Sequence, residues 1–223
     1  MDKKPKFSRV IAFGLLFPLL GTALLSVTFC ILQKNYYYLP RSLDFLIRFF
    51  YDAKFIFLYI ALFFFVGMVV RTIAFAPLRD AVAVSVSGLF FTVLTAMTSF
   101  VITLVFLRND LSADVFGTYL YSDFLCAMEN AARYFLCVVA AWAVRLFYSS
   151  RGTSPSFEKP YIVPKGAVGF PLAVSLAVWL AVTVCGVAFS SVTENAVGTL
   201  VYELVVCVCG YFIAVLGAIF ISK

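Results

Sequence analysis

The sequence contains no histidine and few charged residues, and each shortage excludes a class of protein. Without histidine there is no Ser-His-Asp triad, no H-E-x-x-H zinc site and no histidine-ligated haem. Charged residues make up 13% of the chain, against about 25% in ordinary soluble domains. Because so few charges cannot solvate the surface of a soluble domain, and 64% of the residues are hydrophobic, the composition predicts an integral membrane protein.

The six cysteines predict neither a disulfide framework nor a metal centre. All of them lie inside apolar runs, whereas disulfide frameworks belong to small, loop-rich secreted domains. Cys207 and Cys209 are two residues apart, which turns them about 200° around a helix and points them to nearly opposite faces. We therefore expect no metal ion and no cofactor. The net charge of +6 is distributed between apolar runs, so we expect no nucleic-acid partner either.

Six apolar runs are long enough to cross a bilayer, for which a helix needs about 20 residues. They lie near residues 10–32, 54–76, 81–107, 123–148, 167–191 and 196–221. The sequence predicts an all-α polytopic membrane protein, a bundle of six transmembrane helices that forms a single domain over residues 1–223. A connection with three prolines, near residues 149–166, separates the first four runs from the last two and predicts a four-plus-two organisation.

Positive charges between the runs predict the orientation, since Lys and Arg are enriched in cytoplasmic loops. With the N-terminus inside, most of the 17 basic residues fall on the inner side, including Lys3, Lys4 and Arg9. We therefore expect both termini in the cytoplasm, and a bacterial cytoplasmic membrane whose lipid bilayer surrounds the protein. The first outer loop runs against this rule, because it carries most of the cations predicted outside, Lys54 among them.

Within that outer loop, residues 41–52 have an amphipathic pattern of their own. At 100° per residue, the apolar side chains share one face of a helix, while Asp44, Arg48 and Asp52 lie opposite. The three tyrosines at 36–38 suit the level of the lipid headgroups. The pattern predicts either a short interfacial helix on the outer leaflet or a re-entrant or packed cap over the bundle.

The fourth run is apolar enough to cross the membrane, yet it carries charged and amide side chains. At 100° per residue these fall within an arc of about 120°, so they form one stripe along the helix. The stripe comprises Asp123, Cys126, Glu129, Asn130, Arg133 and Cys137. A charged side chain at the helix centre costs roughly 2.5–3.5 kcal/mol, and two of them roughly cancel the gain from the apolar residues. The stripe is therefore predicted to face the bundle interior or a wet cavity.

The charges of this stripe allow two pairings. Glu129 and Arg133 are four residues apart with the acid first, which is the favourable order for an ion pair on one helix. Glu203 in the sixth run offers the alternative, because its helix face also carries small residues that allow close packing, including Gly210 and Ala214. Arg133 is then the expected partner of Glu203, with Glu129 competing for the same guanidinium group.

Two further runs carry stripes of small or hydroxyl side chains. In the third run, hydroxyl groups that include Thr95 and Ser99 fall within about 80° of arc, and they either line a polar interior or bond back to their own backbone. The fifth run has a small residue at every fourth position, which permits close approach of another helix. These residues are Gly169, Ala173, Ala177 and Ala181. We expect this ridge to pack within the chain, with a partner membrane subunit as the alternative.

The polar stripes favour solute handling over catalysis, because polar groups buried at membrane depth mark substrate or ion pathways. The candidate residues for binding a small polar or anionic solute are Arg133, Glu129, Asn130, Glu203, Asp123, Thr95 and Ser99. No lysine is predicted within a span, so we expect no serine–lysine dyad, no catalytic residue and no enzyme. The alternative function is a structural or accessory subunit of a membrane complex, without a small-molecule site.

The predicted architecture is similar to one known class of membrane subunit. Its span count, its size and its paired inside termini are similar to those of the substrate-binding subunits of energy-coupling-factor vitamin transporters. The similarity concerns architecture and involves no shared sequence motif. It implies that the chain is a substrate-binding subunit of a larger transporter.

Overall fold

The computed structural model describes residues 10, 12–38, 40, 43–150, 166–189 and 196–221. This part of the chain is 93% helical and contains no strand. Six helices are long and apolar enough to span a membrane, which confirms the predicted all-α bundle. In chain order they are α2 (Phe17–Lys34), α3 (Asp44–Phe75), α4 (Leu78–Leu107), α5 (Ala113–Ser150), α6 (Gly169–Phe189) and α7 (Ala196–Phe220). The N-terminal basic residues and most of the connection with three prolines lie outside the described residues.

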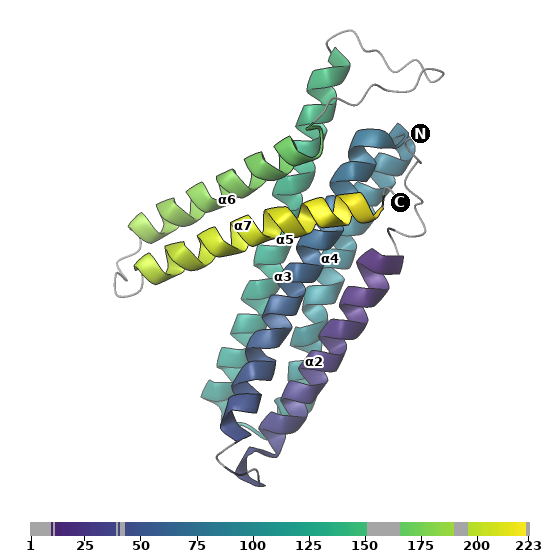
Figure 1. Ribbon diagram of the computed structural model, residues 1–223. Coiled ribbons are helices and arrows are strands. Elements are labelled where there is room, and N and C mark those ends of the chain that lie inside the picture. The colour runs from purple at the N-terminus through teal and green to yellow at the C-terminus, as the bar shows by residue number, and fades with distance from the viewer. Residues whose placement is uncertain are drawn as a thin grey trace.

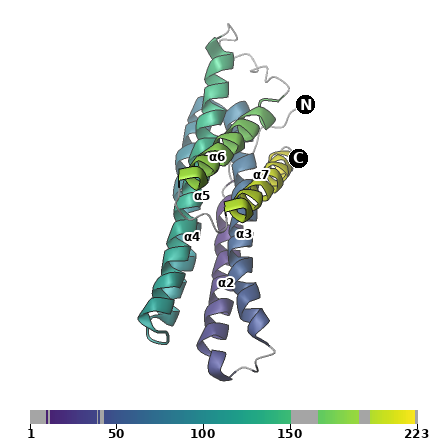
Figure 2. The ribbon, with the colours of Figure 1, turned by 90° about the vertical axis from the view of Figure 1, so that its left-hand side faces the viewer.

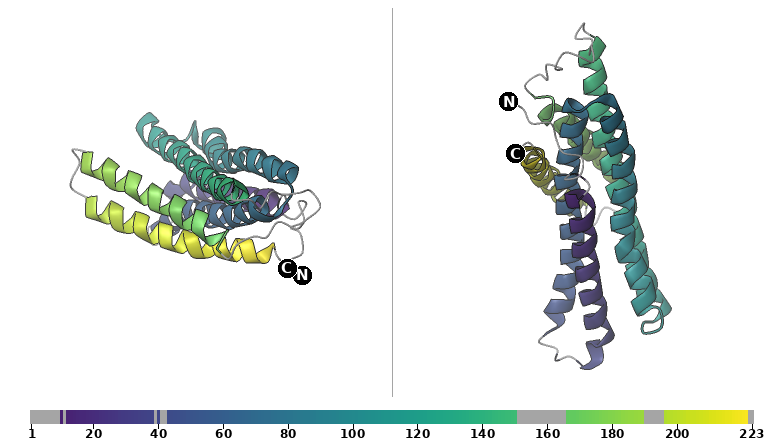
Figure 3. Two further views of the ribbon diagram at one scale, coloured as in Figure 1. Left: turned by 90° about the horizontal axis from the view of Figure 1, so that it is seen from above. Right: turned by 90° about the vertical axis from the view of Figure 1, so that its right-hand side faces the viewer.

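The six helices adopt the predicted four-plus-two organisation. Helices α2 to α5 run alongside one another, and α6 and α7 form a hairpin that lies obliquely across them (Figure 1). Viewed from the side, α6 lies against α5 and α7 against α3 (Figure 2). From above, the hairpin follows one side of the bundle and extends beyond it (Figure 3). The Phe13 and Phe220 rings are 5.0 Å apart, so the two ends of the described chain meet. That both termini face the cytoplasm stays a prediction.

Helix α3 is the central helix of the molecule. It contacts α2, α4, α5 and α7, and nearly all its side chains from Leu62 to Ile73 are buried. Apolar residues occupy every side of this stretch, which is the pattern of a helix enclosed by others. Both polar clusters described below are built against this helix.

The helix predicted at residues 41–52 is not a separate element, and of the two alternatives the segment is closer to the packed one. From Asp44 onward these residues form the first turns of α3, and the first two positions of the segment lie outside the described residues. The helix continues because no Gly or Pro interrupts residues 44–66. The apolar face of the segment packs on the bundle, where Ile47 is buried and Phe50 packs against the same cluster.

Helix α7 approaches α3 at backbone distance. A Cβ atom added to Gly67 would lie 1.7 Å from the carbonyl oxygen of Ala214, and one added to Gly217 would lie 2.1 Å from the carbonyl oxygen of Phe64. Gly210, on the predicted small-residue face of α7, is buried in the same contact. Residues with little or no side chain are what allow two helices to come this close.

Candidate functional site

The charged side chains predicted inside the membrane are buried between helices. Asp123, Asn130 and Arg133 on α5 and Glu203 on α7 are each less than one-tenth exposed. Glu129 lies at the edge, with 30% of its side chain exposed. The four charged residues are divided between two clusters, and Asn130 lies beside a small cavity.

The first cluster is an ion pair between Lys54 and Asp123. The Nζ and Oδ1 atoms are 2.7 Å apart, and both side chains are fully buried. Ser99 donates a hydrogen bond to Oδ1 over 3.1 Å, and Thr103 donates to Oδ2 over 2.7 Å. Ser26 donates in turn to the Ser99 hydroxyl, so α2, α3, α4 and α5 all contribute. The ion pair is therefore supported by hydrogen bonds to both carboxylate oxygens, which buried charges need in order to stay buried.

Aromatic rings enclose the ammonium group of Lys54. Its Nζ atom is 4.9 to 5.0 Å from the ring centroids of Phe29, Tyr51 and Phe55. The ring of Tyr119 lies 5.3 Å from the rings of Phe29 and Tyr51, so four rings cover this end of the bundle. Because ring faces attract cations, this aromatic cage stabilises a charge that has no access to water.

Two predictions about Lys54 are wrong: that it lies in an outer loop, and that no lysine lies within a span. Lys54 belongs to the early turns of α3. The charged and tyrosine-rich residues that precede it made this part of the chain resemble a loop. Two signals point to the correct assignment: the lack of any helix breaker from residue 44 onward, and the need of Asp123 for a cationic partner inside the membrane.

The second cluster is built around Arg133. Its Nη2 atom is 2.9 and 3.0 Å from the two carboxylate oxygens of Glu203, and 3.9 Å from Oε2 of Glu129. Of the two pairings that the sequence allows, the one with Glu203 is therefore the closer. Trp179 on α6 donates its indole N–H to Glu203 over 3.0 Å, and the Tyr59 hydroxyl on α3 donates to Glu129 over 2.9 Å. Sequence reasoning missed both aromatic partners.

Arg133 has hydrogen-bonding capacity that the protein does not use. Among the residues that the structure describes, its Nε and Nη1 atoms have no hydrogen-bond partner, although only 1% of the side chain is exposed. The guanidinium carbon lies 4.6 Å from the ring centroid of Tyr59 and 4.8 Å from that of Trp179. Buried donors without a partner are uncommon, because each one forfeits its hydration without replacement. The cluster therefore holds buried donors that the described residues leave unsatisfied.

The charges of the second cluster do not balance. One guanidinium group, that of Arg133, faces the carboxylates of Glu129 and Glu203, which gives an excess of one negative charge when all three are ionised. The pair of Lys54 and Asp123 is neutral by comparison. Because uncompensated charge is expensive inside a membrane, the second cluster is the one with a physical reason to bind a positively charged group.

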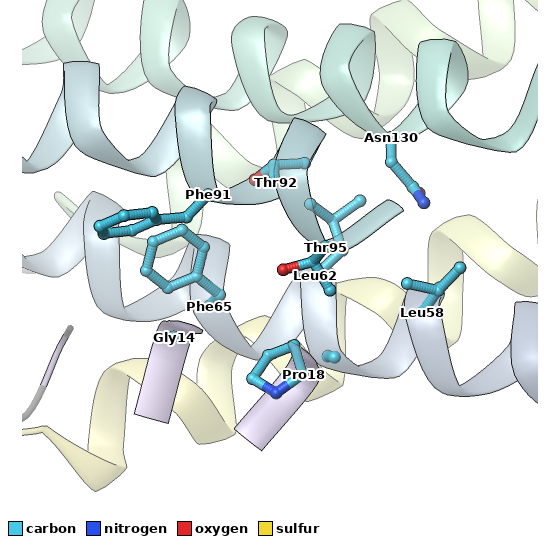
Figure 4. Close-up of a pocket in the computed structure, with 10 residues that line it drawn as sticks. Gly14, Pro18, Leu58, Leu62, Phe65, Phe91, Thr92, Thr95 and Asn130 are labelled. Atoms are coloured by element: carbon cyan, nitrogen blue, oxygen red, sulfur yellow. The ribbon is translucent and has the colours of Figure 1, made fainter. Parts of the chain in front are cut away.

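A small cavity lies beside Asn130. It is about 20 Å³ in volume, which is room for about one water molecule. Thr92 and Thr95 also line it (Figure 4). Their hydroxyl oxygens, like Oδ1 of Asn130, are buried and have no hydrogen-bond partner in the described part of the chain. Pro18 forms part of its wall, beside the π-helical turn η1 (Ala12–Leu16). Thr95 and Asn130 therefore line a water-sized cavity, and Ser99 belongs to the Lys54 cluster.

The small-residue ridge of α6 faces outward. Ala173, Ala177 and Ala181 are exposed, while Gly169 is half-buried. These three alanines therefore do not pack within the chain, in contrast to the expectation from sequence. The opposite face of α6 packs on the bundle because its larger side chains bury more apolar area. That face carries Leu172, Leu176 and Trp179.

Neither a metal site nor a known relative identifies the function. In the part of the chain that the structure describes, no three His, Cys, Asp or Glu side chains come together as a metal site requires. Comparisons with protein-family models, with curated proteins and with solved structures return no match for this chain.

Proposed function

We propose that this integral membrane protein binds or transports a small polar solute at the cluster of Arg133, Glu129 and Glu203. The supporting observation is unused binding capacity at membrane depth. Two nitrogen atoms of a buried guanidinium group have no hydrogen-bond partner among the described residues, and this one cation faces two carboxylates. Costly polar groups of this kind in a membrane interior mark substrate or ion pathways. The neutral, fully paired cluster of Lys54 and Asp123 has a structural role in this proposal.

The position of the cluster supports a carrier or a substrate-binding subunit of one. Tyr59 and Arg133 belong to the four-helix bundle, whereas Trp179 and Glu203 belong to the hairpin of α6 and α7. Any displacement of the hairpin from the bundle breaks the contact between Arg133 and Glu203. Many transporters bind their substrates between two helical units that rock against each other. We propose no catalytic step.

The proposal is tested by thermal unfolding of the purified protein against sugars, nucleosides, water-soluble vitamins, amino acids and amines. At least one solute is expected to raise the unfolding temperature, since a ligand at 100 times its Kd stabilises by about 2.7 kcal/mol. Arg133→Lys keeps a positive charge beside Glu203 and is expected to abolish the rise in unfolding temperature that the solute causes. Lys34→Gln, at an exposed ion pair, is the control. The absence of any response, or equal responses in Arg133→Lys, contradicts the proposal.

A second candidate function, an accessory membrane subunit, is favoured by the outward ridge of α6. An exposed row of small residues lets a helix of another protein approach closely. Ala177→Leu is then expected to release a stoichiometric partner that co-purifies from native membranes. Val182→Leu, at an exposed position on the same helix, is the matched control and is expected to retain the partner. A monomer that purifies without any partner contradicts this candidate.

A further inference from the structure

The Arg133 cluster also indicates which kind of solute fits, an inference that rests on the proposed function. We infer that the solute is a small organic cation, an ammonium compound with a single positive charge and a neutral oxygen acceptor close to it. Glu129 binds the ammonium group in this assignment, and Arg133 donates to the oxygen acceptor. The net charge of the cluster, the unpartnered N–H groups of Arg133 and the exposure of Glu129 each support this assignment independently.

The net charge of the cluster favours a cationic solute over a zwitterionic or an anionic one. The cluster carries one positive and two negative groups, so a bound monocation makes it neutral. A zwitterion leaves the excess negative charge in place, and an anion increases it, which low-dielectric surroundings penalise. The anionic solute that Arg133 alone predicts is therefore the least favourable class.

Glu129 is the carboxylate available to that cation. It accepts one hydrogen bond, from the Tyr59 hydroxyl, while an ionised carboxylate has about four acceptor positions. With 30% of its side chain exposed, it is also the member of the cluster that a solute reaches first. Glu203 is less available, because Arg133 and Trp179 already donate to it. The ring of Tyr59 adds an aromatic surface, as is common in ammonium sites.

Arg133 supplies the second recognition element. Its Nε and Nη1 N–H groups are buried and unpartnered, and arginine can only donate hydrogen bonds. A neutral carbonyl or hydroxyl oxygen can accept from one of these donors without bringing in more negative charge. Glu129 Oε2 lies 3.9 Å from Nη2 of the same guanidinium group, so a small solute can reach both the carboxylate and a free N–H group of Arg133. The test compounds therefore carry the ammonium group and the oxygen a short distance apart.

A series of compounds on one two-carbon skeleton tests the inference. Glycinamide is a cation with a carbonyl group, and glycine is the corresponding zwitterion. Acetamide lacks the positive charge, and ethylamine lacks the oxygen acceptor. Choline and ethanolamine are further cations that carry a hydroxyl group. Binding is measured by thermal unfolding and by the fluorescence of Trp179, which is the sole tryptophan in a Trp142→Phe background. Glycinamide, ethanolamine or choline is expected to bind more tightly than ethylamine, and glycine and acetamide are expected to bind weakest.

Glu129→Gln provides the decisive comparison, because it removes the charge, retains an acceptor for the Tyr59 hydroxyl and lies at a partly exposed position. It is expected to weaken binding of the cations by about 30-fold or more. Asp110→Asn, which removes a carboxylate from the exposed pair with Lys34, is the control and is expected to leave binding unchanged.

Three results overturn the inference. They are binding of glycine or acetamide in preference to the cations, cation binding that survives Glu129→Gln, and stabilisation by sodium or potassium chloride in place of any organic cation. If a neutral or anionic solute from the wider panel binds, and Arg133→Lys abolishes its binding, the proposed function stands and this inference fails. If no solute of either set binds, both fail.

Discussion

Replacing Lys54 by methionine is expected to lower the free energy of unfolding by about 3–5 kcal/mol, because the substitution leaves the Asp123 carboxylate buried without a countercharge. Both side chains are fully buried in the structure, so neither can turn to water when its partner is lost. The measurement is equilibrium unfolding of the purified protein in detergent micelles. The double variant Lys54→Met/Asp123→Leu is expected to regain most of this loss, since apolar replacement of a whole buried pair is often neutral.

The exposed pair of Lys34 and Asp110 is the matched control. Its atoms are 3.1 Å apart, which is nearly as close as the buried pair, but 54% of the lysine side chain is exposed. Exposed ion pairs contribute about 0–1 kcal/mol, so Lys34→Met is expected to have little effect. If Lys34→Met and Lys54→Met destabilise the protein equally, the buried pair does not hold the bundle together.

The second large effect is expected at Gly67, where α3 and α7 meet. Gly67→Ala places a methyl group 1.7 Å from the Ala214 carbonyl oxygen, and neither backbone can yield without moving its helix. Overpacking of a core costs typically 1–3 kcal/mol, occasionally more, and a contact with backbone belongs at the upper end. We expect a lower unfolding temperature. We also expect faster maleimide labelling of Cys207, a buried residue of α7, measured by mass spectrometry.

Gly186 provides the control for this prediction. It also lies within a transmembrane helix, α6, but a Cβ atom added to it meets nothing within 4 Å. Alanine favours a helix over glycine by about 1 kcal/mol, so Gly186→Ala is expected to be neutral or stabilising. Equal destabilisation by Gly67→Ala and Gly186→Ala would show that helix propensity, and not the close approach of α7, sets the cost.

The features that sequence predicts well are local ones. The number of spans follows from the length of each apolar run, and the direction of the α5 stripe follows from the 100° turn of a helix. Asp123, Asn130 and Arg133 are therefore correctly placed in the interior. The separation of four helices from two follows from the prolines between them. Each of these inferences needs only residues that are close neighbours in the chain.

The features that sequence misses depend on contacts between distant residues. The Lys54–Asp123 ion pair joins positions 69 residues apart, and no local sequence pattern around the lysine indicates its partner. The side of α6 that faces the bundle is likewise decided by competition: its large side chains bury more apolar area than its alanine ridge does. Periodicity identifies the two faces of such a helix without saying which one is covered.

The aromatic cage around Lys54 bears on how the chain is made. Asp123 follows Lys54 by 69 residues, so at about 5–20 residues per second the lysine waits on the order of 3–14 s for its counter-ion. Phe29 and Tyr51 are synthesised before Lys54, and Phe55 is the residue directly after it. The three rings that face the ammonium group are therefore made well before the carboxylate, and only Tyr119 arrives with α5. We expect these rings to shelter the ammonium group during translation until α5 is delivered to the bilayer.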